Sequence, residues 1–524
     1  MAIECSRNLM KLNQVVGEES SQALVEGEIN VPDSREPVVR ILDISCDAII
    51  NSHEVIQDKI MVEGILRYDA LYIPEGEDAA VDAVDAEIGF TQYLEMPGVQ
   101  PGMTSRLQLD VEHIDYELVS GRRINVKAVL NLYGRVSQVM ELEAVQDFTG
   151  LTDVEALTDH IRTSVSGEAG NAQTMVREDL ELSDSMPSIL KILRKEARVQ
   201  IQEKKAVDNK VVVHGDVDLN LLYLCDDEED PVQFLEQSIP FSHSVDIPGA
   251  YQGMDCTADV TVSEFYTDPR ENINNELRII DAELILNLEA QVFETQEDEI
   301  LVDAYSPSVP MELKKRKIRL QQFAGETQEQ TVVKESITFP EGVPKARKIL
   351  YVDARPSIAE ESVGDGKVLL EGILSVQVVY QTNESALLIG SFREDVPFQH
   401  TLTMEDIDSS MECRSEAVTE HMDTTLTAQD EVELKAAVLL KTSVTRTIEK
   451  EIIIGAGESE NVSAGAPGIY IYFVQPGDNL WNVAKKYNTT ISDILKYNET
   501  TEEESELGPG TKLMIFKKLE SSVV

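Results

Sequence analysis

The sequence has little positive charge for its length. It carries 45 Lys and Arg against 96 Asp and Glu, a formal net charge of −51 in 524 residues. Nucleic acids and anionic lipid surfaces attract an excess of basic side chains, so this balance argues against both as partners. It favours proteins with basic patches as partners, or partners whose binding does not depend on charge.

Cysteine and long apolar runs are also scarce. The five cysteines are an odd number, lie far apart and include no Cys-x-x-Cys pair. This pattern favours reduced thiols in the cytoplasm over a disulfide framework. The first residues lack a basic region followed by an apolar core, and no run approaches the ~18 apolar residues of a membrane span. We therefore expect a protein that is made in the cytoplasm, stays there and does not span a membrane.

Motifs that carry catalysis or bind metals are missing. The sequence has no GxxxxGK[ST], HExxH or GxSxG motif and no His/Cys cluster with zinc spacing. The segment Gly364 to Lys367 resembles part of a phosphate loop, but Val368 replaces the Ser or Thr that would reach magnesium, so a turn before a strand is favoured. We predict no enzyme, no cofactor and no metal. The alternative of a cell-wall hydrolase with a catalytic pair of carboxylates stays open, because the chain has so many acidic residues.

An internal repeat of about 150 residues fills the chain up to residue 468. The second copy follows the first by 151 residues and the third follows the second by 157, as in Tyr72, Tyr223 and Tyr380. Other landmarks share this register: Gly64, Gly215, Gly372; Phe90, Phe241, Phe398; Met103, Met254, Met411. Apolar, β-branched segments with frequent turns predict β-sandwich-like units, and the glycine predicts a bulge or a close backbone approach. The period suits duplicated whole domains.

Composition predicts linkers and one short helix. The small and polar stretch 167–173 and the Gly-rich stretch 455–468 are typical of linkers, as is Ser306 to Gln330, whose basic run 314–317 is expected to form salt bridges. Ser185 to Glu196 is interpreted as a short helix. The expected units are a first repeat at 1–166, a second at 174–305, a linker at 306–330, a third repeat at 331–452, a flexible linker at 453–468 and a small module at 469–518.

The C-terminal module has its own order of elements. An alternating run, Tyr470 to Val474, ends at Pro476-Gly477 as a strand would. Asp478 is predicted to cap a first helix, and Thr490 has capping-box spacing for a second. The segment 512–516 is a closing strand. The sequence therefore predicts strand, helix, helix, strand in about fifty residues.

These residues resemble the LysM domain, in segments 474–487, 495–498 and 508–513. The resemblance implies binding of glycans that contain N-acetylglucosamine in a shallow groove between two loops. The groove residues it implies are Gly477, Asp478, Asn479, Leu480, Trp481, Leu507, Gly508, Pro509 and Gly510. Five glutamates between 499 and 506 favour a polar protein partner instead. Trp481 is the only tryptophan in the chain, and we favour a role for it in the small core over stacking on sugar.

The repeats resemble the spore-coat-associated SPOCS domain in their Lys-x-x-x-x-Gly strand, the terminal Tyr and a Pro-Gly-Met element, which the third repeat lacks at 404–407. Several such domains before one LysM are similar to the SipL family of spore coat morphogenetic proteins, and more distantly to the SpoVID family. The resemblance implies a scaffold in the mother-cell cytoplasm that encases the forespore, with a SpoIVA-like coat ATPase as LysM partner. We expect the β-rich repeats to make lateral or homotypic contacts, with other coat proteins or a second copy of the chain. The alternative is a peptidoglycan-binding protein attached to the cell wall.

Overall fold

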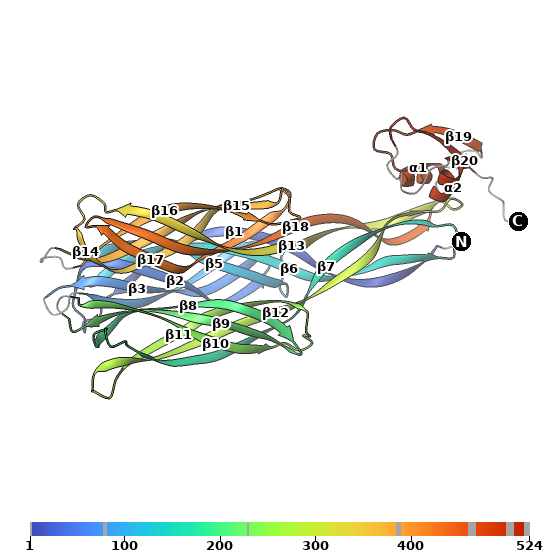
Figure 1. Ribbon diagram of the computed structural model, residues 1–524. Helices are drawn as coiled ribbons and strands as arrows, with labels where there is room; N and C mark the ends of the chain where they lie inside the picture. Colours follow the sequence, from blue (N-terminus) through green and yellow to red (C-terminus); the bar gives the residue numbers. More distant parts are fainter. Residues whose placement is uncertain are drawn as a thin grey trace.

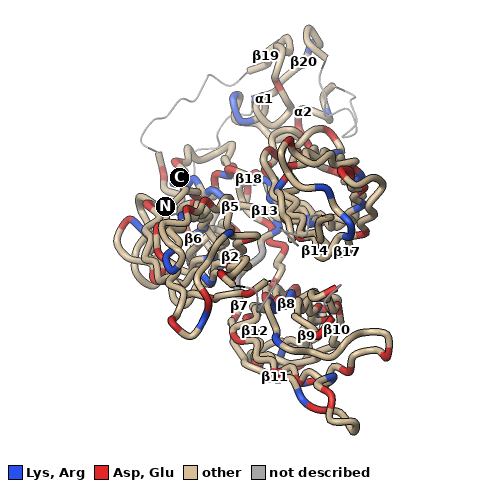
Figure 2. Tube along the Cα trace, turned by 90° about the vertical axis from the view of Figure 1, so that its left-hand side faces the viewer, with Lys and Arg blue, Asp and Glu red and all other residues tan. Residues whose placement is uncertain are grey.

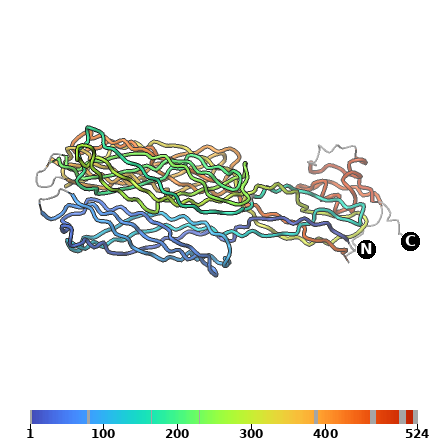
Figure 3. The backbone as a smooth tube through the Cα atoms, turned by 90° about the horizontal axis from the view of Figure 1, so that it is seen from below, coloured from blue at the N-terminus to red at the C-terminus, as the bar shows by residue number. Residues whose placement is uncertain are grey.

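The computed structural model describes residues 3–76, 81–227, 230–383, 389–459, 468–498 and 508–517. Three β-rich bodies lie side by side, a narrower stalk extends from them, and a small module lies at the tip of the stalk (Figures 1 and 3). The only α-helices among these residues are the two short ones of the small module. The predicted fold class, mainly β with three repeated domains and a small βααβ domain, is confirmed.

Each repeat consists of six antiparallel strands. The first repeat has β1 (Glu4–Asn30), β2 (Val38–Ile56), β3 (Lys59–Pro74), β4 (Asp82–Glu95), β5 (Thr104–Ser120) and β6 (Arg123–Thr149). The second has β7 (Glu155–Glu181), β8 (Ile189–Val207), β9 (Lys210–Cys225), β10 (Val232–Asp246), β11 (Asp255–Glu271) and β12 (Leu277–Tyr305). The third has β13 (Met311–Thr338), β14 (Ala346–Gly364), β15 (Lys367–Thr382), β16 (Ile389–Thr403), β17 (Glu412–Ala428) and β18 (Glu431–Glu458).

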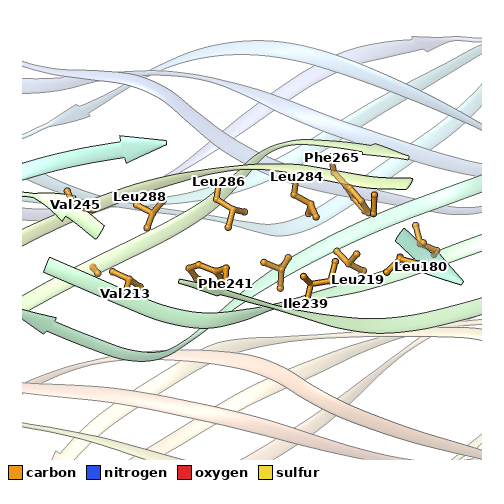
Figure 4. Close-up of a cluster of buried hydrophobic side chains, with 14 of the residues drawn as sticks. Leu180, Val213, Leu219, Ile239, Phe241, Val245, Phe265, Leu284, Leu286 and Leu288 are labelled. Atoms are coloured by element: carbon orange, nitrogen blue, oxygen red, sulfur yellow. The ribbon is translucent and has the colours of Figure 1, made fainter. Parts of the chain in front are cut away.

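The six strands form two three-stranded sheets that pack as a sandwich. In the first repeat the sheet orders are β2-β3-β4 and β1-β6-β5, and the other repeats follow the same order. Alternate residues point into the core, as the period of a half-buried strand requires. In the second repeat, Leu284, Leu286 and Leu288 of β12 face Leu219 and Phe241 of the opposite sheet (Figure 4).

The sequence landmarks have structural causes. The three landmark tyrosines are fully buried, and each donates its hydroxyl hydrogen to a carbonyl 36 residues earlier: Tyr72 to Glu36, Tyr223 to Pro187, Tyr380 to Pro344. The bond ties the end of the third strand to the loop that enters the second. The predicted close approach at the landmark glycines is also confirmed. A Cβ at Gly215 would lie 2.2 Å from the Gln200 carbonyl oxygen and 2.9 Å from the Phe241 ring.

The predicted linkers inside the repeats are wrong. Residues 167–173 lie within β7, most of 306–330 lies within β13, and β18 continues to Glu458, so the repeats are bounded at 4–149, 155–305 and 311–458. The first and last strands of each repeat have 27 to 29 residues and pair along their whole length. Their polar side chains lie on an exposed face and therefore resembled linker composition. Residues 460–467 lie outside the described part of the chain.

The basic run 314–317 and the predicted helix at 185–196 also lie in strands. Lys315 and Lys317 belong to β13 and form ion pairs with Asp303 at 3.3 Å and Glu449 at 2.6 Å. The predicted salt bridges are therefore present, but in a strand. The segment from Ile189 belongs to β8, where register shifts beside Lys191 and Arg194 interrupt the alternation of side chains. Such bulges bring apolar residues to a spacing that resembles a helix.

The long strands continue beyond the sandwiches as three two-stranded ribbons that pack together into the stalk (Figure 1). Every ribbon contributes buried apolar residues from both of its strands. These residues are Leu12 and Leu142, Ile161 and Ile300, and Leu320 and Ile452. A ribbon of two strands cannot bury a core alone, so the three repeats stabilise one another along the stalk.

The three sandwiches surround a pseudo-threefold axis, which Figure 2 shows end-on. Equivalent residues of all three repeats meet in one buried cluster: Leu42, Leu193 and Leu350; Leu71, Leu222 and Val379; Val81, Val232 and Ile389. The second strand of each repeat contacts the preceding repeat around the ring, since β8 touches β3 and β4, β14 touches β10, and β2 touches β15 and β16. Each interface joins the second strand of one repeat to the third or fourth strand of another, so the two contacting faces differ. Three such interfaces close the ring.

Charged residues of the second strands line the same axis. Among the ion pairs between repeats, three join the second strands two by two: Arg194–Asp43 at 2.5 Å, Arg198–Asp353 at 3.0 Å and Arg355–Asp47 at 3.4 Å. Burial alone would lower the pKa of the Arg194 guanidinium, but Asp43, Tyr351 and Glu196 together outweigh burial and raise it. Burial and the Asp353 carboxylate raise the pKa of Glu196 to about 7, although Arg355 lies 3.5 Å away. The three ion pairs differ, so the repeats are not interchangeable around the ring.

Candidate functional site

The small module has the predicted order of elements. It consists of β19 (Gly468–Phe473), α1 (Leu480–Tyr487), α2 (Ile491–Asn498) and β20 (Lys512–Lys517), and β19 and β20 pair in antiparallel register. The two helices pack on one face of this hairpin and bury Val483, Ala484 and Ile494 with Leu513 and Ile515. Asn498 closes the module, because its side-chain amide bonds to both backbone groups of Met514.

The predicted role of Asp478 as helix cap is wrong. The N-cap of α1 is Asn479, whose side-chain oxygen accepts a hydrogen bond of 2.7 Å from the Asn482 backbone. Asp478 lies one residue earlier and accepts from the Tyr472 hydroxyl and from the Gln475 backbone N–H. The Tyr472 bond and then the Gln475 bond lower the pKa of Asp478. Asp478 therefore holds the turn that presents the loop.

The structure brings the two predicted groove loops together. The Val474 N–H donates to Thr511 and the Gly510 N–H donates to Val474, so both loops lie at the same end of the hairpin. Gly477 and Gly510 have φ values of +89° and +88°, which favour glycine. Gly477, Asn479, Gly508, Pro509 and Gly510 are exposed, whereas Leu507 lies outside the described residues.

Leu480 and Trp481 do not belong to this exposed surface. They are 6% and 8% exposed. Leu480 packs in the module core, while the Trp481 ring meets the ring of Tyr305 edge-to-face with centroids 5.1 Å apart. The indole N–H donates a hydrogen bond of 2.9 Å to Oδ2 of Asp303. Both partners belong to β12, at the tip of the stalk, so Trp481 joins two domains.

Asp303 is the centre of this contact. Its two carboxylate oxygens each accept a bond of 2.6 Å from Lys485 Nζ of α1, and Lys315 of β13 lies 3.3 Å away. The Tyr305 hydroxyl also donates to the Thr489 carbonyl at 2.8 Å. Burial alone would raise the pKa of Asp303, but the bonds from Lys485 and Trp481 outweigh it and lower the pKa. The carboxylate is therefore ionised at neutral pH.

Sequence reasoning missed Asp303 and Tyr305, because neither belongs to a motif or to a landmark of the repeat. One signal was available. The last strand of the first repeat ends at Thr149, that of the third at Glu458, and only that of the second at an aromatic residue, Tyr305. An aromatic side chain at the end of one of three equivalent strands indicates a contact that the other two do not make.

Two other features are absent from the part of the chain that the structure describes. It contains no group of three or more His, Cys, Asp or Glu side chains placed to hold a metal ion. Neither helix there has the length and apolarity needed to cross a membrane. Gly364 and Lys367 bound the turn between β14 and β15, which agrees with the turn predicted there.

Comparison with known proteins identifies the domains. The SipL, SPOCS domain model matches residues 37–119, 188–269 and 345–427, and the LysM domain model matches 472–516. Each SPOCS match spans the four inner strands of a repeat and leaves the long first and last strands outside. The endolysin of Bacillus phage PZA is 31% identical over 75 residues, which cover 14% of this chain and 29% of the endolysin. No solved structure matches the chain.

These domains fit a protein of the spore coat or one that binds the cell wall. The SPOCS matches recur at the spacing of the three sandwiches, and the LysM match covers the βααβ module. The chain therefore has a SipL-like architecture, with three SPOCS domains followed by one LysM domain.

Proposed function

We propose that the chain is a non-enzymatic scaffold of the spore coat, and that its LysM domain docks a coat basement ATPase of the SpoIVA kind at the forespore surface in the mother cell. The observation that carries this proposal is the position of the LysM loops. Their described residues are exposed and lie at the tip of the stalk (Figure 1). The tip is far from the three SPOCS sandwiches around the pseudo-threefold axis, which we call the SPOCS ring. A rigid spacer with a small exposed module at its end suits an adaptor between two layers.

Packing of the three repeats into the SPOCS ring limits which surfaces could bind other coat proteins or a second copy of the chain. The faces by which one repeat contacts the next are occupied within the chain, through the buried cluster of Leu42, Leu193 and Leu350. Lateral contacts in a coat would therefore use the outer sheet faces or the end of the ring opposite the stalk. The net charge of −51 favours basic surfaces on such partners.

A second candidate is attachment to peptidoglycan, and the open loops favour it. Gly477 and Gly510 leave room at the loops, since a Cβ at either position would meet no atom within 4 Å. A sugar could approach the backbone closely there. Glycan binding would then give the chain a role at the wall instead of in a protein layer.

Titration calorimetry of the full chain distinguishes the two candidates. We expect saturable binding to the SpoIVA-like ATPase and none to chitin oligomers. Replacing Gly508 with Arg should weaken that binding about tenfold or more, ~1.4 kcal/mol, because the new side chain fills the loop end. A Cβ at Gly508 meets only Thr511 Oγ1 at 3.6 Å, so the substitution should leave the fold intact.

The matched control is Gly89→Arg on β4, where a Cβ would meet only the Gly64 carbonyl oxygen at 4.0 Å. It should leave the affinity unchanged. Binding to chitin oligomers alone would assign the chain to wall attachment, and binding to neither ligand would contradict both candidates.

A further inference from the structure

We infer that the tip of the second ribbon is a docking site for the LysM domain of the same chain. Asp303 and Tyr305 form this site and hold α1 through Trp481 and Lys485. The contact decides which LysM face can meet a partner. It concerns the domain used in the proposed function, but it can be tested without any partner, so the two can fail separately.

The chemistry of the contact is specific. The Asp303 side chain is 17% exposed and accepts from an ammonium and an indole N–H at once. Hydrogen bonds to an ionised carboxylate are shorter and stronger than those between neutral groups. The Tyr305 ring lies edge-to-face on Trp481, the favoured geometry for two aromatic rings. A random contact would not satisfy a largely buried carboxylate in this way.

Only the second ribbon can make this contact among the strand ends that the structure describes. Asp147 of β6 has a carboxylate at the corresponding position, directly after the register shift near the end of the strand, but Thr149 stands where Tyr305 stands. Near the end of β18 the corresponding residue is Gly455. The docking site therefore arises from the differences between the repeats and not from the repeat itself.

Docking separates two faces of the LysM domain. The α1 face is held against the stalk by the buried Trp481 and the half-buried Lys485, whereas Gly477 and Gly510 remain exposed. A partner that binds the loops meets the docked module without a rearrangement. A partner that needs the α1 face must first displace Asp303 and Tyr305.

The only tryptophan of the chain reports this contact directly. In the unliganded full-length protein, Asp303→Ala and Tyr305→Ala should each shift Trp481 emission to longer wavelength and increase its quenching by acrylamide several-fold. Raising the salt concentration should move the wild type in the same direction, since the Lys485 contact is ionic. Hydrogen exchange of the α1 amides should stay slow in both variants, which shows that the module remains folded.

Asp147→Ala is the matched control, because it removes a carboxylate from the equivalent place on the first ribbon. It should leave the emission unchanged. Unchanged emission in Asp303→Ala and Tyr305→Ala would overturn the inference. Emission that depends on protein concentration would also overturn it, because the docking site would then belong to a second copy of the chain.

Discussion

Replacing Arg194 with methionine should lower the free energy of unfolding by about 3–5 kcal/mol. The Arg194 side chain is 3% exposed and donates to Asp43 at 2.5 Å and to the Asp69 carbonyl at 3.3 Å. Without it, the Asp43 carboxylate remains buried between two repeats without its partner, and such a charge is costly. Urea unfolding of the full chain measures the change.

Two further variants separate the cause. Asp43→Leu combined with Arg194→Met should recover most of the lost stability, because a buried ion pair replaced by apolar residues is often neutral. Arg7→Met removes an ion pair with Glu143 in which the Arg7 side chain is 51% exposed, and it should cost less than about 1 kcal/mol. A similar loss of stability in Arg7→Met and Arg194→Met would show that burial of the Arg194–Asp43 pair does not determine the cost of breaking it.

Replacing Gly215 with alanine should destabilise the chain by about 3 kcal/mol. The new Cβ would lie 2.2 Å from the Gln200 carbonyl oxygen, which is backbone and cannot turn away, and 2.9 Å from Phe241. The neighbouring strands β8 and β9 would have to move apart. Gly64 and Gly372 face a backbone oxygen at 2.4 and 2.6 Å, so alanine should have similar effects in the other repeats. Thermal and urea unfolding measure the loss.

Gly457→Ala is the control for this substitution. Gly457 also lies in a strand, β18, but a Cβ there would meet no atom within 4 Å. Alanine should be neutral or stabilising by up to ~1 kcal/mol, because it reduces the freedom of the unfolded chain. A destabilised Gly457→Ala variant would mean that glycine is needed in these strands for a reason other than close approach.

The features predicted correctly are those that leave a local or repeated trace in the sequence. The spacing of Tyr72, Tyr223 and Tyr380 revealed the repeats, because each tyrosine ties the same loop to the same strand. The capping spacing at Thr490 predicted the start of α2, and its hydroxyl oxygen accepts from the Asp493 backbone. These signals depend on residues close in sequence or on copies of one pattern.

The features that were missed depend on residues far apart in the sequence. One face of each ribbon is buried only because the other two repeats cover it. The opposite face of β13 is polar and exposed, so its composition resembled that of a linker. Arg194 and Asp43 are 151 residues apart, and Trp481 and Asp303 are 178 apart. The first separation equals the repeat period, so Asp43 and Arg194 occupy equivalent positions of two repeats, but the period alone does not show that these positions meet at the axis. No pattern in the sequence links Trp481 to Asp303. The order of elements in the LysM domain was predicted correctly, whereas the contact of Trp481 with the stalk could be found only in the folded chain.

The long ribbons also determine how the chain responds to tension. The LysM domain follows β18, whose pairing with β13 runs from the stalk tip to the SPOCS ring. Antiparallel hydrogen bonds lie perpendicular to the strands. A pull along the stalk, with the three sandwiches held in place, therefore shears all the bonds of the ribbon together instead of breaking them one by one. The stalk is consequently a mechanical link that resists stretching between two anchored ends.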